Sequence, residues 1–162
     1  MSLDNKFFIH DNLISKLIDE LFVLNRSLTG KDNLKTLTYL KKNLLPFLEI
    51  KKTKSNTKIF DWKIPPEWNV TDAYVLDKYK NKIIDFKNNN LHLIGYSIPV
   101  NKTLSKSVLF KNLYSIPSQP NAIPYATSYY KKKWGFCISD DQKKFFHKSY
   151  KTEDKFKVVI NS

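Results

Sequence analysis

The chain has 162 residues, of which 41% are hydrophobic and 14% aromatic, and it carries a formal net charge of +13. This composition is typical of one globular domain, or one domain with a compact insertion, and it argues against a disordered chain. The single cysteine excludes an internal disulfide, and no apolar run is long enough to span a membrane. The N-terminal segment lacks the unbroken apolar stretch of a signal peptide, so we expect a cytoplasmic protein without membrane association.

The positive charge does not by itself indicate a nucleic-acid partner. Apart from Arg26, every basic residue is a lysine, whereas proteins that bind phosphates and base edges favour the planar guanidinium group of arginine. The lysines are spread along the chain, with the longest run at 131–133. The composition therefore favours a solvated basic surface over a nucleic-acid interface.

Two amphipathic helices are predicted near the N-terminus. In the first, apolar residues recur at helical spacing over 13–24, and Asp11 is its candidate N-cap. Because two amphipathic helices must bury their apolar faces, we expect them to cover a sheet.

The second helix has its apolar stripe over 34–45. Thr29 and Asp32 have the spacing of a helix start, and Pro46 ends the pattern because its ring clashes with a continuing helical turn.

Alternating apolar residues and turn residues predict the strands. They are expected over 48–52, 59–64, 73–76, 82–86, 91–96, 135–138 and 155–160. A short helix is predicted over 103–113, and Pro117, Pro120 and Pro124 then impose an extended loop.

The stretch 123–142 contains one tryptophan and four further aromatic residues, a density that indicates a packing centre or a binding surface. At its end, Ser139 and Gln142 have the spacing of a capping box. The strand at 135–138 should therefore lead directly into a helix.

No metal or phosphate site can be identified in the sequence. The three histidines, His10, His92 and His147, are far apart and show no metal-ligand spacing. The three glycines form no phosphate-binding loop. We therefore assign no cofactor and no catalytic residue to this chain.

Cys137 has two interpretations. It can act as a nucleophile with His92 or His147, or it can be a small buried side chain within an apolar strand. The apolar neighbours Phe136 and Ile138 favour packing.

Five residues are candidates for substrate binding. Arg26 can hold a carboxylate or pair with a local helix end, and His92 can be a ligand or a half-buried hydrogen-bonding residue. Tyr125, Tyr129 and Trp134 can stack on a ligand or pack inside the fold.

Several short motifs together resemble one family. In chain order they are Arg26-Ser27-Leu28-Thr29-Gly30, Phe60-Asp61-Trp62, Glu67-Trp68-Asn69, Asp72-Ala73-Tyr74, Asn90-Leu91-His92, Tyr96-Ser97-Ile98-Pro99-Val100, the segment 124–130, and Trp134-Gly135-Phe136-Cys137. They resemble motifs of the bacterial and archaeal zinc-aminopeptidase-like proteins, in which a domain of unknown function is inserted in a peptidase fold. The resemblance covers nearly the whole chain.

The resemblance implies an α+β chain with three parts. Residues 1–58 would form the helix pair and first strand of a zinc-exopeptidase-like α/β fold. Residues 59–138 would form the inserted, mostly antiparallel β domain, and residues 139–162 would return to the peptidase-like fold.

The resemblance also implies a function for a longer protein. In such enzymes zinc activates a water molecule that attacks a peptide or amide substrate. The family's zinc ligands match no position here, so we expect this chain alone to be inactive. The alternative is a non-catalytic binding or protein-interaction module, with an anionic partner suggested by the charge. An unpaired sheet edge in a partial fold also predicts self-association.

Overall fold

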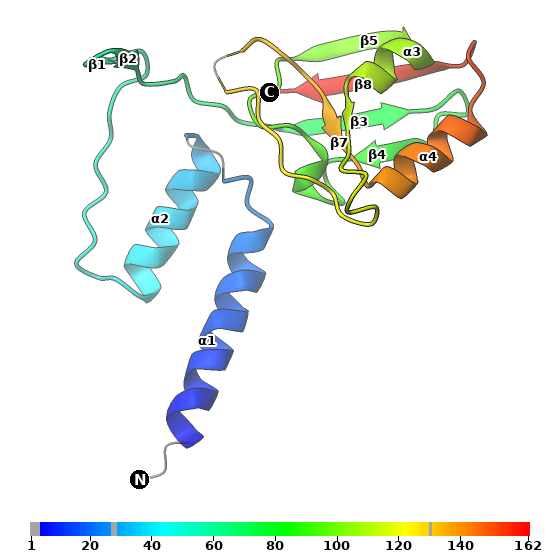
Figure 1. Cartoon of the computed structure of the whole chain (residues 1–162). Helices are drawn as coiled ribbons and strands as arrows, with labels where there is room; N and C mark the ends of the chain where they lie inside the picture. Colours follow the sequence, from blue (N-terminus) through cyan, green and yellow to red (C-terminus); the bar gives the residue numbers. More distant parts are fainter. Residues whose placement is uncertain (1–3, 27–28, 130) are drawn as a thin grey trace. The chain divides into compact units, whose positions relative to one another are not determined.

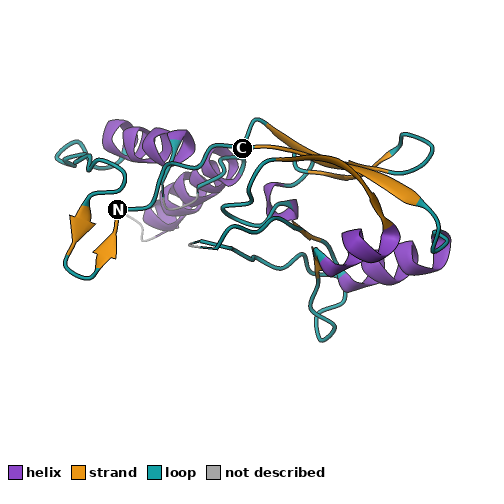
Figure 2. Ribbon diagram, turned by 90° about the horizontal axis from the view of Figure 1, so that it is seen from above, coloured by secondary structure: helices purple, strands orange, loops and turns teal. Residues whose placement is uncertain are grey.

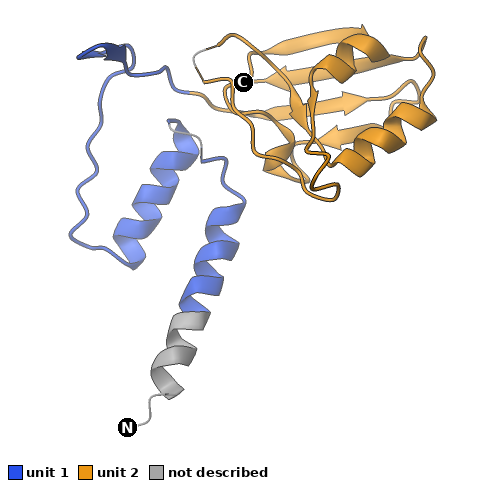
Figure 3. Cartoon of the chain, in the orientation of Figure 1, with its two compact units in different colours: residues 1–67 blue, residues 68–162 orange. Residues whose placement is uncertain are grey.

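The computed structural model describes residues 4–26, 29–129 and 131–162, with side chains from Asn12 onward (Figure 1). The chain divides into two compact units, residues 1–67 and residues 68–162 (Figure 3), called unit 1 and unit 2 below.

Unit 1 contains two helices and a small hairpin. Helix α1 runs from Asp4 to Phe22. Because it begins well before Asp11, the predicted N-cap at that residue is wrong; residues 4–10 contain no glycine or proline to end the helix.

Helix α2 runs from Lys31 to Asn43 and begins differently from the prediction. Its N-cap is Gly30, at φ 119°, with no capping side chain. The Thr29 hydroxyl instead donates to the Pro66 carbonyl at 3.1 Å, and the Asp32 carboxylate accepts the Asn25 N–H at 3.1 Å. The helix ends shortly before Pro46, as predicted.

The predicted strand at 59–64 is a two-stranded antiparallel hairpin. Its strands are β1, Lys58–Ile59, and β2, Trp62–Lys63, and Phe60 turns the chain at φ 52°. The described residues 48–52 form no strand, so that prediction is wrong.

Unit 2 is built on a four-stranded antiparallel sheet with the order β4-β3-β8-β5. Its strands are β3, Asp72–Leu76; β4, Lys82–Asp85; β5, Val100–Ser105; and β8, Lys155–Asn161. Helices α3, Lys106–Lys111, and α4, Asp140–Ser149, lie on one side of this sheet (Figure 2). A short parallel pair joins β6, Leu113–Tyr114, to β7, Phe136–Cys137.

The core of unit 2 lies between the sheet and these helices. Phe156, Val158 and Ile160 alternate along β8 and are at most 1% exposed. They pack with Val75 of β3 and with Phe136 of β7 in one apolar cluster. The period-two alternation of 155–160 therefore predicted both the strand and its buried face correctly.

Two predictions in the middle of unit 2 are wrong. Residues 91–96 are not a strand; the Asn89 side chain caps a 3₁₀ turn, η1, over Asn90–His92. Residues 103–113 are not one helix, because β5 continues to Ser105 and α3 begins only after it. Pairing of β5 with β8 outweighs the local helical pattern.

The prediction for 135–142 is confirmed. β7 leads into α4, and the Ser139 hydroxyl accepts the Gln142 N–H at 3.1 Å. The Gln142 side chain, however, donates to the Ile83 carbonyl at 3.2 Å and thereby ties α4 to β4.

The division into 1–58, 59–138 and 139–162 stays a prediction. Unit 2 spans its second boundary, since β8 lies between β3 and β5.

Candidate functional site

Two loops of unit 2 run side by side, and the second carries three of the five candidate binding residues. The paired loops, residues 93–98 and the described residues of 123–129 and 131–135, are joined by backbone hydrogen bonds. Gly95 N–H donates to Ala126 O at 2.8 Å, Ser128 N–H to Gly95 O at 2.8 Å, and Ile98 N–H to Lys133 O at 2.9 Å. Tyr125, Tyr129 and Trp134 lie on the second loop, and His92 directly precedes the first.

The paired loops are anchored by an aromatic cluster. Tyr96 is 8% exposed and has a left-handed backbone, at φ 61°. Its ring stacks on Trp68 at 5.6 Å between centroids and meets the edge of Tyr129 at 5.3 Å. Trp68 Nε1 donates to the Ser97 carbonyl at 3.0 Å. A bulky residue holds a positive φ only where its surroundings enforce it, so this cluster fixes the loop.

His92 connects the paired loops to β7. Its Nδ1 lies 2.7 Å from the carbonyl oxygen of Cys137, so this nitrogen carries the proton and donates. The ring is half-buried. His92 therefore has the hydrogen-bonding role named as one of its two interpretations, and any ligand role falls to Nε2.

The Cys137 thiol is fully buried, and burial raises its pKa to about 11. At neutral pH it is a protonated thiol rather than a thiolate nucleophile. Packing is the role that this environment supports.

The three aromatic candidates differ in exposure. Tyr125 is 73% exposed, whereas Tyr129 and Trp134 are half-buried and pack against the apolar cluster of unit 2. Only Tyr125 presents most of its ring to solvent.

Arg26 belongs to unit 1 and lines a shallow hollow of about 240 Å³ on α1, with Leu17, Ile18, Leu21 and Phe22. Four of the candidates therefore belong to unit 2, and Arg26 belongs to unit 1.

A polar network ties the β3–β4 turn to the α4–β8 connection. Tyr150 Oη donates to Asp77 at 3.1 Å, and Lys78 pairs with Asp154 at 3.0 Å. Burial and the nearby charge of Asp77 raise the pKa of Tyr150 to about 12. The hydrogen bond from Lys78 lowers the pKa of Asp154. These contacts hold the β3–β4 turn against the α4–β8 connection, which is a structural role.

The described side chains do not fit a zinc ion. Among residues 12–26, 29–129 and 131–162, no group of three or more His, Cys, Asp or Glu side chains could hold a metal.

Sequence reasoning missed Tyr96 and Trp68 as the residues that fix the paired loops. Gly95-Tyr96-Ser97 is a visible turn signal, but the alternation over 91–96 predicts a strand that includes Gly95 and Tyr96. No local pattern indicates that Trp68 stacks on a residue 28 positions later.

Among the described residues, no helix combines the length and apolar character needed to cross a membrane.

The chain is similar to known proteins whose names mention a peptidase or an aminopeptidase-like domain. It is 46% identical over 149 residues to a Clostridium acetobutylicum protein named "Putative polysaccharide biosynthesis protein with aminopeptidase-like domain". This match covers 92% of the chain but 33% of the relative. The fold is similar to the crystal structure of a "putative peptidase" from Clostridium acetobutylicum, with a TM-score of 0.82 and 43% identity over 93% of this chain and 34% of that one.

The chain thus spans about a third of the length of these relatives, and it resembles them in sequence and fold. The predicted aminopeptidase-like resemblance and the α+β class with antiparallel sheets are confirmed. The model of the domain of unknown function DUF2172 matches residues 67–162, nearly the same residues as unit 2. The chain belongs to the DUF2172 family.

Proposed function

We propose that this sequence is the N-terminal part of a zinc-dependent aminopeptidase-like hydrolase. The observation that carries the proposal is the similarity to a relative about three times as long whose name includes an aminopeptidase-like domain. In this proposal the zinc ligands lie in the remaining two thirds, and this chain supplies scaffold and shapes access to a peptide or amide substrate. Residues 59–138 would be the insertion in the peptidase fold.

The exposed apolar residues of unit 1 support a scaffold role. Ile18 and Phe22 of α1 are 58% and 57% exposed, and Phe47 is 81% exposed. Apolar area of this size is normally covered in a complete fold. We propose that the peptidase-like part covers it.

Within this proposal, Tyr125 is the best placed of the five candidates to contact a substrate, because its ring is the most exposed of the three aromatic candidates. Tyr129 and Trp134 would hold the loop that presents it, while His92 would orient the loop through Cys137. Arg26, which lies in unit 1, would bind a carboxylate of the substrate.

The test compares two chains. One is the 162-residue chain; the other continues along the same reading frame to the length of the Clostridium relative. Hydrolysis of amino-acid p-nitroanilides is measured with zinc and with a chelator. We expect turnover by the longer chain only, lost on chelation and restored by zinc. A stop codon after Ser162, or chelator-resistant turnover by the 162-residue chain, would contradict the proposal.

The second candidate is a non-catalytic module that binds an anionic partner. It is favoured by the surface charge of unit 2, where the buried acids Asp77, Asp85, Asp140 and Asp154 are engaged in internal hydrogen bonds. Inactivity of the longer chain with zinc present, together with salt-sensitive binding of an anionic partner, would select this alternative.

A further inference from the structure

The two outer strands of the unit 2 sheet differ in how their outer edges are used. β4 has four residues, and its pairing with β3 is irregular at Val75–Leu76. Its Ile83 carbonyl already accepts the hydrogen bond from Gln142 of α4. β5 has six residues and ends the strand order, and no strand of the described chain pairs with its outer side. β5 is therefore the open edge.

The register determines which peptide groups of β5 point outward. Directly after the strand, the Lys106 N–H donates to the Asp154 carbonyl at 3.2 Å. The peptide N–H of Lys106 therefore faces the side of β8. In an antiparallel pair, alternate residues direct both their N–H and C=O toward the partner strand. The residues that face β8 are Val100, Lys102 and Leu104, and those that face away are Asn101, Thr103 and Ser105.

The outward groups are accessible. Asn101 and Thr103 are both exposed. In the part of the chain that the structure describes, no hydrogen bond reaches their outward N–H and C=O groups. This edge offers a row of unsatisfied donors and acceptors to an added strand.

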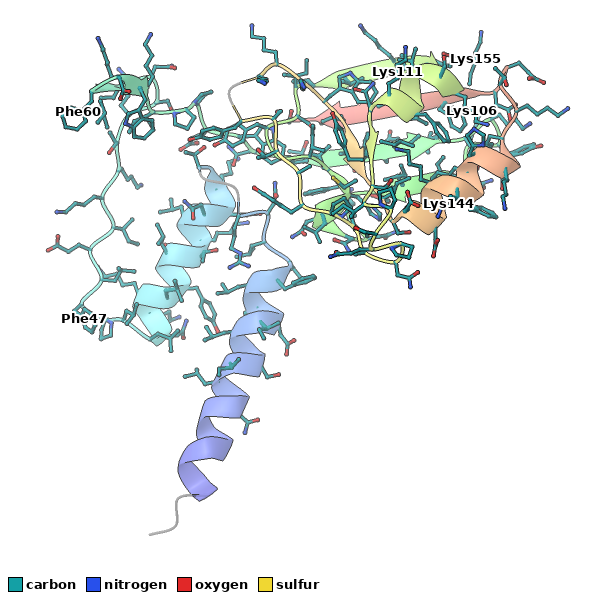
Figure 4. The ribbon with its side chains drawn as sticks, viewed as in Figure 1. Phe47, Phe60, Lys106, Lys111, Lys144 and Lys155 are labelled. Carbon is teal, nitrogen blue, oxygen red and sulfur yellow. The ribbon has the colours of Figure 1, made fainter. Side chains whose placement is uncertain are left out.

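The side chains near this edge are basic. Lys102 within β5 is exposed, and so are Lys155, which lies opposite Ser105, and Lys111 at the end of α3 (Figure 4). The Lys106 side chain is not available to bind a partner at this edge, because its Nζ donates to the carbonyls of His147 and Tyr150.

The acidic residues of unit 2 do not offset this charge. Unit 2 contains 16 lysines against seven aspartates and glutamates, and the exposed acidic residues are Asp141 and Glu153. The open edge therefore lies in a positive field.

We propose that the outer edge of β5 binds an extended acidic peptide segment of another protein as an additional strand. The backbone of the segment would pair with the outward groups of Asn101 and Thr103. Its side chains alternate between the two faces of the sheet, so acidic residues at every second position would all lie on one face, where they meet Lys102.

A second copy of this chain is a poor occupant of the same edge. Its own β5 would bring another Lys102 against the first, and like charges across a strand pair are destabilising. Lys102 thus opposes pairing of identical edges while it favours an acidic strand.

The test uses the full 162-residue chain and a synthetic peptide of alternating glutamate and valine. Amide hydrogen exchange is followed by NMR at saturating peptide. We expect exchange at Asn101 and Thr103 to slow by roughly tenfold or more, as for amides that enter a hydrogen-bonded ladder. A matched peptide of equal charge, with proline in place of valine, should give no protection because it cannot pair as a strand.

Three variants separate strand pairing from general charge attraction. Thr103→Pro removes one outward N–H without removing a bond to β8, and should weaken binding about fivefold. Lys102→Glu should weaken it on the order of tenfold. Lys132→Glu makes the same change in net charge on the exposed 131–133 run and should change affinity less than about twofold.

Three outcomes would overturn the proposal. They are equal binding of the proline peptide, equal weakening by Lys132→Glu and Lys102→Glu, and protection that appears without peptide as protein concentration rises. The last would identify a second copy as the occupant. If Thr103→Pro fails to fold, the exchange data on the unmodified chain still decide between these outcomes.

Discussion

Asp77 shows how a buried carboxylate stays ionised in unit 2. Its side chain is 7% exposed, and burial by itself raises the pKa of a carboxyl group. Hydrogen bonds from Asn81, from the Tyr79 N–H and from Tyr150 more than offset burial, so the pKa is lowered. One carboxylate thus closes the β3–β4 turn and holds the end of α4.

Removing this carboxylate should be costly. Asp77→Ala leaves several donors without an acceptor, so we expect a loss of about 2–3 kcal/mol in the free energy of unfolding. Urea titration at pH 7 measures it. Asp141→Ala, at an exposed position on α4, is the control and should change stability by less than about 0.5 kcal/mol. An equal loss of unfolding free energy in both variants would show that the hydrogen bonds of Asp77 do not contribute to stability.

The lowered carboxyl pKa values set the direction of the pH dependence. Asp77, Asp85, Asp140 and Asp154 all have folded-state pKa values below the ordinary 3.8. Such groups stabilise the fold above their unfolded pKa, and this stability is lost as the pH falls through the folded value. We expect constant carboxyl contributions down to about pH 5 and a steep loss below about pH 4. Denaturant titrations from pH 7 to pH 2 test this, and a flat profile below pH 4 would contradict it.

Gly135 occupies a position where no side chain fits. An added Cβ would lie 2.6 Å from Cε2 of Tyr114 and 2.8 Å from the Asn112 carbonyl oxygen. Gly135→Ala should therefore destabilise the protein by about 1–3 kcal/mol. Gly95→Ala is the comparison, because its nearest neighbour is the Thr127 hydroxyl at 3.1 Å, a side chain that can rotate. In thermal unfolding, the melting temperature of Gly135→Ala should be lower than that of Gly95→Ala. The reverse order would be inconsistent with these distances.

At the scale of elements, α4 depends on a local signal. Ser139→Ala removes the acceptor for the Gln142 N–H and should cost about 1 kcal/mol. Ser139→Asp, which keeps an acceptor at the N-cap, should retain most of the stability. Thermal unfolding of both variants measures the difference, and an equal loss in both would argue against the cap.

Elements with local signals were predictable from the sequence. The Ser139–Gln142 spacing gave the start of α4, and the alternation of 155–160 gave β8. The strands predicted at 73–76 and 82–86 are also confirmed, as β3 and β4, because two short apolar runs flank a turn.

Elements that depend on distant partners were not predictable. Residues 103–105 of β5 fall in the predicted helix 103–113, because the pairing of β5 with β8 joins residues 50 to 60 positions apart and leaves no local signal. Apolar and polar residues alternate over 91–96, which predicts a strand. In the structure, the Asn89 side chain caps a 3₁₀ turn there, and Gly95 forms hydrogen bonds with the second of the paired loops. For the candidate site, the sequence indicated the aromatic stretch but not the Trp68–Tyr96 contact that fixes it.

At the scale of the whole molecule, the two units differ in the amount of core that they contain. The large apolar cluster lies entirely within unit 2. In unit 1, Phe47 and Phe60 are 81% and 90% exposed (Figure 4), and Leu21 is the one large apolar side chain of its described residues that is buried. Burial of apolar area is the main source of folding free energy, so unit 2 should carry most of the stability.

Separate expression tests this difference. We expect a fragment of residues 68–162 to fold cooperatively and to give a dispersed NMR spectrum, whereas residues 1–67 should give none. Limited proteolysis of the full chain should leave a resistant product that begins near Trp68. A collapsed spectrum for 68–162, or an equally stable fragment 1–67, would contradict this expectation.

The central position of β8 has a consequence for biosynthesis. β8 contacts both β3 and β5, yet it is the last strand of the sheet to be translated. Until it leaves the ribosome, the β3–β4 hairpin and β5 have no strand between them and remain open to mispairing. Shortening this sequence by the residues of β8 would split the sheet in two, whereas loss of the same number of residues from its beginning would leave every strand pair intact.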